Sequence, residues 1–270
     1  MHRTIILLFG STLYYALSAW ALYAFHAGSL ATALVLFGIP AYAFARYSAA
    51  PAAVLVAVCT LGGGMAILLE GIAHIYGIWY SLGVEELRLF GLVPIETIAS
   101  LCIQTLFLAL LYEFLFDDKS YSVSHARVRY LSLLGFALCA LALIGLHEYL
   151  VKGIFFAHSY LWIIGTLLAS SLIALALYAP FSLKTVKRFG LFTLLAFVPL
   201  CIDLLIAVAN THKIFAYAAD YLATVTIFGQ TVPIEEFVLL FAYPLFVATF
   251  YELYLDDGRL QKDATPAAPL

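Results

Sequence analysis

One segment of this chain occurs twice. Residues 94–118 and 233–257 align without a gap at an offset of 139 positions, and 11 of the 25 aligned positions are identical. Each copy opens with Pro-Ile-Glu, contains Tyr-Glu and closes with Asp-Asp. Four of the identical positions are acidic, which two unrelated apolar stretches would not be expected to share. The match indicates an internal duplication, so we expect the chain to fold as two similar halves.

The composition places both halves in a lipid bilayer. Hydrophobic residues make up 65% of the chain and charged residues 11%, with a mean hydropathy of +1.03, whereas a soluble domain carries about 25% charged residues. The net charge of -3 is small and no basic block is present. We therefore expect lipids, apolar substrates or other membrane proteins as partners, and no nucleic acid.

The four cysteines fall within apolar runs and show no metal-ligand spacing. They are Cys59, Cys102, Cys139 and Cys201. We expect them to be buried small side chains, and we expect neither a metal site nor a disulfide framework.

Hydropathy windows of about 20 residues predict eight membrane-spanning helices. Their ranges are 4–25, 28–46, 52–76, 94–116, 130–150, 159–180, 190–211 and 233–255. The first run is expected to be a span and not a signal peptide, because it continues past 20 residues without a convincing cleavage site. The predicted fold class is an all-α integral membrane protein of two tandem, parallel four-helix repeats. The repeats are residues 1–118 and 130–257, with a cytoplasmic linker at 119–129 and a disordered tail at 258–270.

The basic residues predict how these spans are oriented. Ten Lys and Arg residues fall on the side of the amino terminus, and only Arg88, Lys152 and Lys213 on the other. This bias places both termini in the cytoplasm of a cell-membrane protein. Each half has an even number of spans, so both halves run in the same direction. The Pro-Ile-Glu motifs then open the fourth and eighth spans at the non-cytoplasmic face.

A helix start alone would explain part of the repeated motif. Proline suits the first helical turn, and an acidic residue there meets the positive end of the helix dipole. The two Asp-Asp pairs are expected in the solvated interface. A helix start does not explain Glu70 and Asp203, which lie inside the spans that precede the motifs. Carboxyl groups at such places cost free energy unless they pair, bind a ligand or exchange protons.

Proton exchange is the chemistry that these carboxyl groups favour. A carboxyl group in an apolar cavity can stay protonated at neutral pH because burial disfavours its charged form, and it can then act as a general acid. The candidate catalytic residues are Glu70, Glu96, Asp203, Glu235 and Glu236. Glu235 and Glu236 point about 100° apart on a helix. One of them could face a cavity while the other contacts a neighbouring helix, and the sequence does not decide which.

The motif in its context resembles the integral-membrane lycopene cyclases. The resemblance rests on a Pro-Ile-Glu motif that opens a span in each half. In each half the motif follows a span that contains an acidic residue and a linker rich in aromatic residues. The linkers are Gly77-Ile78-Trp79-Tyr80 and Ile214-Phe215-Ala216-Tyr217. It covers residues 30–257 as two fused halves. It implies a lycopene β-cyclase that closes rings at the linear ends of lycopene to give gamma- or beta-carotene. One departure is Thr97, where the family usually has a second glutamate.

The implied reaction is an isomerisation that needs an acid, a pocket tolerant of a cation and a base, with no metal or cofactor. The resemblance makes Glu235 the leading acid or base, Glu96 its counterpart and Glu236 the next candidate, with Glu70 and Asp203 as proton relays. The candidate substrate-binding residues are His74, Trp79, Tyr80, Phe215 and Tyr217. Each well-placed ring could stabilise a cation by about 0.5 to 2 kcal/mol. The alternative for such aromatic residues is an interfacial belt, and His74 could either orient Glu70 or anchor at the interface.

Other functions stay open at this point. A carotenoid hydratase would share the cation and quench it with water. A proton-coupled transporter would also use intramembrane carboxyl groups, although it usually has inverted repeats. A non-catalytic subunit, or a homo-oligomer, is compatible with the same sequence. The run Gly62-Gly63-Gly64 is no dinucleotide fingerprint and is expected to allow close helix packing.

Overall fold

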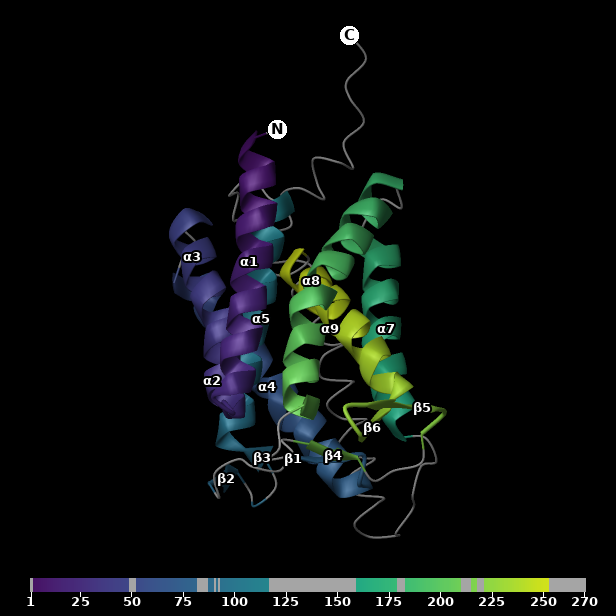
Figure 1. Cartoon of the computed structure of the whole chain (residues 1–270). Helices are drawn as coiled ribbons and strands as arrows, with labels where there is room; N and C mark the ends of the chain where they lie inside the picture. Colours follow the sequence, from purple (N-terminus) through teal and green to yellow (C-terminus); the bar gives the residue numbers. More distant parts are fainter. Residues whose placement is uncertain are drawn as a thin grey trace.

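A computed structural model gives the fold of this chain (Figure 1). It describes residues 2–48, 52–81, 87–89, 91, 93–116, 159–178, 183–209, 215–217 and 221–252. The predicted span 130–150, the linker, both Asp-Asp pairs and the tail lie outside the described residues. Most of the described residues are helical, as the sequence predicts.

The helices of the first half form the left part of Figure 1. They are α1 (His2–Ala24), α2 (Ser29–Ala33), the π-helix η1 (Leu34–Gly38), α3 (Ile39–Ser48), α4 (Ala52–Tyr76) and α5 (Ile95–Phe116). The segments α2, η1 and α3 form one continuous helix, since the residues that join them keep α-helical backbone angles. The π-helical turns directly precede Pro40. Proline has no N–H to offer the carbonyl four residues earlier, which accounts for the wider turns there.

The second half contains α7 (Ser159–Tyr178), α8 (Leu183–Ala209) and α9 (Ile234–Phe250). The helix α8 bends near its middle (Figure 1), where it carries Pro199. Among the described residues, four helical segments are long and apolar enough to cross a membrane, and Tyr160–Ile173 is a shorter apolar one. The four are Ser29–Ser48, Leu55–Tyr76, Ile95–Phe116 and Val186–Ala209. Membrane-spanning helices are therefore compatible with the structure, and the count of eight stays a prediction.

Three small antiparallel sheets gather at one end of the helices (Figure 1). The hairpin of β2 (Arg88–Leu89) and β3 (Val93–Pro94) leads into α5, and that of β5 (Thr224–Ile227) and β6 (Gln230–Pro233) leads into α9. The turn of the second hairpin is Phe228-Gly229, both at positive φ, a conformation that glycine adopts without strain. The third sheet joins the two halves, because β1 (Trp79–Ser81) pairs with β4 (Phe215–Tyr217). The sequence analysis did not predict these strands.

The repeated motif opens a helix in both halves, as predicted. Pro94 and Pro233 end β3 and β6, and α5 and α9 begin at the next residue. Pro233 is extended, with φ -64° and ψ 144°, so it caps the helix and does not form part of its first turn. The amides of Ile95 and Ile234 donate back to residues ahead of the two hairpins, at 3.1 and 3.0 Å. The two halves thus share a local structure of hairpin, proline and helix.

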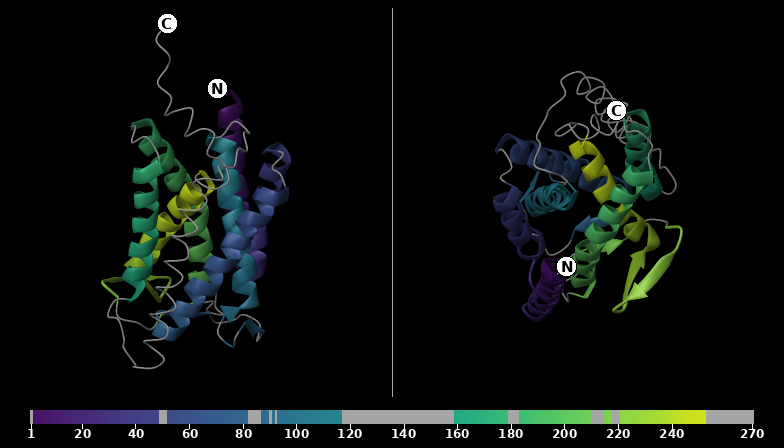
Figure 2. Two further views of the ribbon diagram at one scale, coloured as in Figure 1. Left: turned by 180° about the vertical axis from the view of Figure 1, so that it is seen from behind. Right: turned by 90° about the horizontal axis from the view of Figure 1, so that it is seen from above.

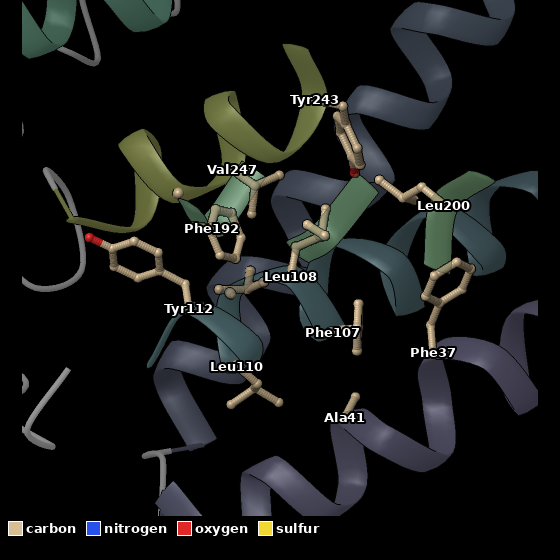
Figure 3. Close-up of a cluster of buried hydrophobic side chains, with 14 of the residues drawn as sticks. Phe37, Ala41, Phe107, Leu108, Leu110, Tyr112, Phe192, Leu200, Tyr243 and Val247 are labelled. Atoms are coloured by element: carbon tan, nitrogen blue, oxygen red, sulfur yellow. The ribbon is translucent and has the colours of Figure 1, made fainter. Parts of the chain in front are cut away.

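The helix α5 is the centre of the packing. It contacts α2, α3, α4, α8 and α9, and neighbouring helices surround it in the view from above (Figure 2). Figure 3 shows side chains from several of these helices interdigitating, among them the fully buried Phe37, Leu108 and Phe192. The close approach of α4 to α5 depends on Gly62, where an added Cβ would lie 2.5 Å from the Thr105 hydroxyl oxygen. The expected packing role is confirmed at Gly62, whereas nothing lies within 4 Å of such an atom at Gly64.

The described cysteines are Cys59, Cys102 and Cys201. All three are free thiols and half-buried. Among the described residues no group of His, Cys, Asp and Glu could hold a metal ion.

Candidate functional site

A cavity of about 150 Å³ lies where the two halves meet. Its walls come from α2, α4 and α5 of the first half and from α8 and α9 of the second, with Trp79 of β1 at one side. Most of the lining is apolar, as expected inside a membrane-spanning bundle. All five helices contribute polar lining residues, and the ionisable carboxyl groups among them come from α4, α8 and α9.

The walls formed by α5 and α9 use matched positions of the duplicated segment. The lining residues are Thr97, Ser100, Leu101 and Gln104 on α5 and Glu236, Leu239, Leu240 and Tyr243 on α9. Each residue of the first set lies 139 positions before its counterpart in the second. The two helices therefore present the same face to the cavity. They differ in chemistry, because Glu236 is ionisable and its counterpart Thr97 is not.

Three of the five predicted acidic residues line this cavity: Glu70, Asp203 and Glu236. They come from α4, α8 and α9. The amide nitrogen of Gln104 donates a hydrogen bond to Oδ2 of Asp203 at 3.0 Å. The hydroxyl of Tyr160, on α7, donates to Oε2 of Glu236. The described lining includes no Lys, Arg or His.

Glu235 and Glu96 lie outside this lining. Glu235 is buried, with 2% of its surface exposed, and its Oε1 accepts a hydrogen bond from the backbone N–H of Leu222 at 2.6 Å. Its Oε2 has no hydrogen-bond partner among the described residues. Glu96 is half-buried in the first turn of α5. Of the adjacent pair in the second motif, Glu236 therefore faces the cavity, and Glu235 holds the segment that precedes β5.

The predicted substrate-binding residues fall at different places. Trp79 lines the cavity. The rings of His74 and Tyr80 meet edge to face at 5.3 Å, and neither residue is part of the described lining. Phe215 and Tyr217 supply the backbone of β4, which pairs with the strand that carries Trp79 and Tyr80.

The sequence analysis missed both side chains that donate hydrogen bonds to the cavity carboxyl groups, Gln104 and Tyr160. Gln104 is an uncharged polar residue in the middle of an apolar span, and that position was a usable signal. Tyr160 had no such signal, because a tyrosine near the start of a span is typical of an interfacial belt. Its ring is buried, with 1% exposed, and packs 5.3 Å from the Trp79 ring.

A second group of buried carboxyl groups lies about two helical turns beyond the last cavity-lining residues of the duplicated segment, Gln104 and Tyr243, at the ends of α5 and α9. The Tyr112 hydroxyl donates to Glu252, and the Tyr251 hydroxyl donates to Glu113 at 2.9 Å. Tyr112 matches Tyr251 and Glu113 matches Glu252 in the duplication, so the two bonds are reciprocal. Arg188 adds an ion pair to Glu252 at 3.1 Å. We call these five residues the reciprocal clamp; none of them is part of the described cavity lining.

The arrangement of the cavity is suited to proton transfer in an apolar space. It combines several carboxyl groups, neutral hydrogen-bond donors that hold two of them, and one indole ring. A scan against protein-family models and searches of curated proteins and solved structures give no match to this chain.

Proposed function

We propose that this chain is a lycopene β-cyclase, an integral-membrane enzyme that makes the rings of gamma- or beta-carotene in carotenoid biosynthesis. The observation that carries the proposal is the cavity with Glu70, Asp203 and Glu236 in its wall, at the junction of two halves of an apolar bundle. The resemblance of the repeated motif to that family gives the substrate class. Lipid and an apolar carotenoid from the bilayer are the proposed partners.

The proposed reaction balances without a redox partner. A carboxylic acid of the cavity gives its proton to the terminal double bond of lycopene, which forms a C–H bond and leaves a tertiary cation. The electron pair of a neighbouring double bond then forms the C–C bond of the ring and moves the cation into it. A carboxylate removes a proton from a ring carbon, and the C–H electron pair becomes the ring double bond. The product has the same mass as the substrate.

The carboxyl groups of the cavity are the proposed acid and base. Glu236 is the leading candidate, because it belongs to the repeated motif and lies in the cavity wall. Asp203 and Glu70 are its proposed partners in proton transfer, and Trp79 is the proposed cation-stabilising ring. Glu235 then supports the site by fixing the segment at Leu222. The first half has Thr97 at the position that matches Glu236. In the described lining, the motif carboxyl group therefore comes from the second half.

The size of the cavity agrees with one end group at a time. A cavity of about 150 Å³ is of the size that holds a benzene molecule in another protein. It cannot enclose a whole polyene, so the rest of the substrate would extend along the helices toward lipid. We therefore propose that the two ends of lycopene react in separate binding events.

The same proposal includes the architecture of two tandem, parallel four-helix repeats with eight spans and both termini in the cytoplasm. The matching hairpin, proline and helix in each half support it. The reciprocal clamp supports it as well, because two bonds exchanged between matched residues are expected for a pseudo-twofold relation. Fusing a reporter enzyme to the carboxyl terminus and measuring its activity on each side of the membrane would test the orientation.

The test of the function is pigment analysis of lycopene-accumulating bacterial cells that express this chain. Conversion to gamma- or beta-carotene at unchanged mass would establish the cyclase, and time points would show whether the monocyclic product precedes the bicyclic one. A gain of water would indicate a hydratase. Unchanged lycopene, with the protein verified in the membrane, would overturn the proposal and favour a transporter or another substrate.

A further inference from the structure

Two neutral side chains hold two of the three cavity carboxyl groups in fixed positions. Gln104 of the first half reaches Asp203 of the second, and Tyr160 on α7 reaches Glu236 on α9. In both cases the bond engages one oxygen of the carboxyl group, Oδ2 of Asp203 and Oε2 of Glu236. Both carboxyl groups are also part of the cavity wall.

The ring of Tyr160 is itself held by packing. It is 1% exposed, its centroid lies 5.3 Å from that of Trp79, and Tyr221 meets it edge to face at 6.4 Å. The Tyr221 hydroxyl is engaged elsewhere, because it donates to the backbone carbonyl of Ile78. A ring fixed by its neighbours offers its hydroxyl in one direction, and such support is what keeps a reactive group in a productive geometry.

We propose that Tyr160 and Gln104 are the positioning residues of the cavity. Each donates a hydrogen bond to one oxygen of its carboxyl group and so fixes the direction in which that group meets the cavity. The inference rests on the proposed function for the identity of that molecule, and the hydrogen bonds themselves can be tested without it. Because Gln104 and Asp203 belong to different halves, the cavity is complete only when the halves are joined.

The first test is infrared spectroscopy of the purified full chain in detergent. The carboxyl band that Glu236→Gln removes belongs to Glu236, and the band that Asp203→Asn removes belongs to Asp203. Tyr160→Phe should shift the Glu236 band to higher frequency and Gln104→Leu should shift the Asp203 band, because a carbonyl stretch rises in frequency when a hydrogen bond to it is lost. Tyr221→Phe is the control for Tyr160→Phe, because it removes the hydroxyl of the tyrosine that packs against Tyr160. Cys102→Ser is the control for Gln104→Leu, because it changes another side chain of α5.

Either assigned band staying in place would overturn the proposal, whatever the chain catalyses. If Gln104→Leu does not fold, Gln104→Asn shortens the side chain by one methylene group and probes the same bond, and the Asp203 band should shift in the same direction. At position 160, Tyr160→Phe removes a single oxygen atom and is already the smallest change that tests the bond. In a chain that converts lycopene, Tyr160→Phe and Gln104→Leu should lower kcat about 10- to 100-fold, the loss expected when a buried acceptor loses its hydrogen-bond donor. KM should stay within about twofold because the lost bonds do not touch the substrate. A rise in KM at unchanged kcat would contradict the positioning role.

Discussion

The cavity and the reciprocal clamp both use residues of the duplicated segment and differ in how well the duplication is preserved. At the clamp, matched residues are identical, Tyr112 with Tyr251 and Glu113 with Glu252. At the cavity, three of the four matched pairs hold different residues, among them Thr97 against Glu236 and Gln104 against Tyr243, and only the pair Leu101 and Leu240 is identical.

The difference has a physical reason. Where two similar helices pack about a pseudo-twofold axis, identical residues on both helices can form the same contact twice, as the two Tyr–Glu bonds of the clamp do. An acid and a base must differ, so a site that moves a proton in and out gains from unequal walls. The buried carboxyl groups of the clamp therefore hold the two halves together, and those of the cavity wall are the proposed acid and base.

Replacing Glu236 is expected to have the largest effect. Glu236→Gln keeps the shape of the side chain and removes its proton chemistry, so product formation should fall by about 10² to 10⁴-fold. The thermal midpoint of the purified protein should not change. Glu96→Gln is the control, because Glu96 also lies in the first turn of its helix but outside the described cavity lining. If Glu96→Gln abolishes turnover and Glu236→Gln does not, the assignment of the cavity as the site is wrong.

The clamp should respond in the opposite way, with lost stability and retained chemistry. Arg188→Met leaves the fully buried Glu252 without its cation, and breaking a buried ion pair costs about 3 to 5 kcal/mol. Thermal unfolding in detergent would measure the loss, and the protein that stays folded should keep its turnover per molecule. Lys187→Met, at the exposed neighbouring position, is expected to change neither property.

The two tyrosines of the clamp offer a finer test. Tyr112→Phe and Tyr251→Phe each remove one hydroxyl donor from a buried carboxyl group, at a cost of about 1 to 3 kcal/mol. The reciprocal geometry predicts similar costs for both. Equilibrium unfolding in denaturant would compare them. A large effect of one variant beside none of the other would show that the clamp is not symmetric in energy.

The smallest expected effect concerns the unequal walls of the cavity. Thr97→Glu places a carboxyl group at the matched position on α5, facing the same space. In the background of Glu236→Gln it should restore a small but measurable part of the lost activity, detectable by product analysis. Thr97→Gln in the same background is the control, because a glutamine side chain has the size of glutamate and no carboxyl group. Equal activity of the two double variants would mean that position 97 cannot take over the proton transfer.

The sequence predicted the helices better than the short strands and hairpins that connect them. Apolar runs and the Pro-Ile-Glu starts located α5 and α9 because hydropathy and helix-start chemistry are local. The hairpins were missed, although Thr224–Ile227 is rich in β-branched residues and precedes a Phe-Gly turn, a pattern that indicates a strand. A four-residue strand between two apolar helices is easily read as a loop.

The site was predicted in its residue types and less well in its geometry. The acidic residues in the preceding spans, Glu70 and Asp203, line the cavity because carboxyl groups inside apolar helices need such a place. The sequence could not choose between Glu235 and Glu236, because the choice depends on where the chain before β5 returns to meet the helix. Nor could it assign Tyr160, whose partner lies 76 positions away.

The pairing of β1 with β4 limits how the two halves can move. That ladder ties the halves together at one end of the bundle, and the clamp ties them at the other. Rocking one half against the other, as alternating-access carriers do, would break either a strand ladder or buried Tyr–Glu bonds. A molecule that reaches the cavity is thus expected to enter sideways from lipid, by small rearrangements of side chains between neighbouring helices, while the frame around it stays closed.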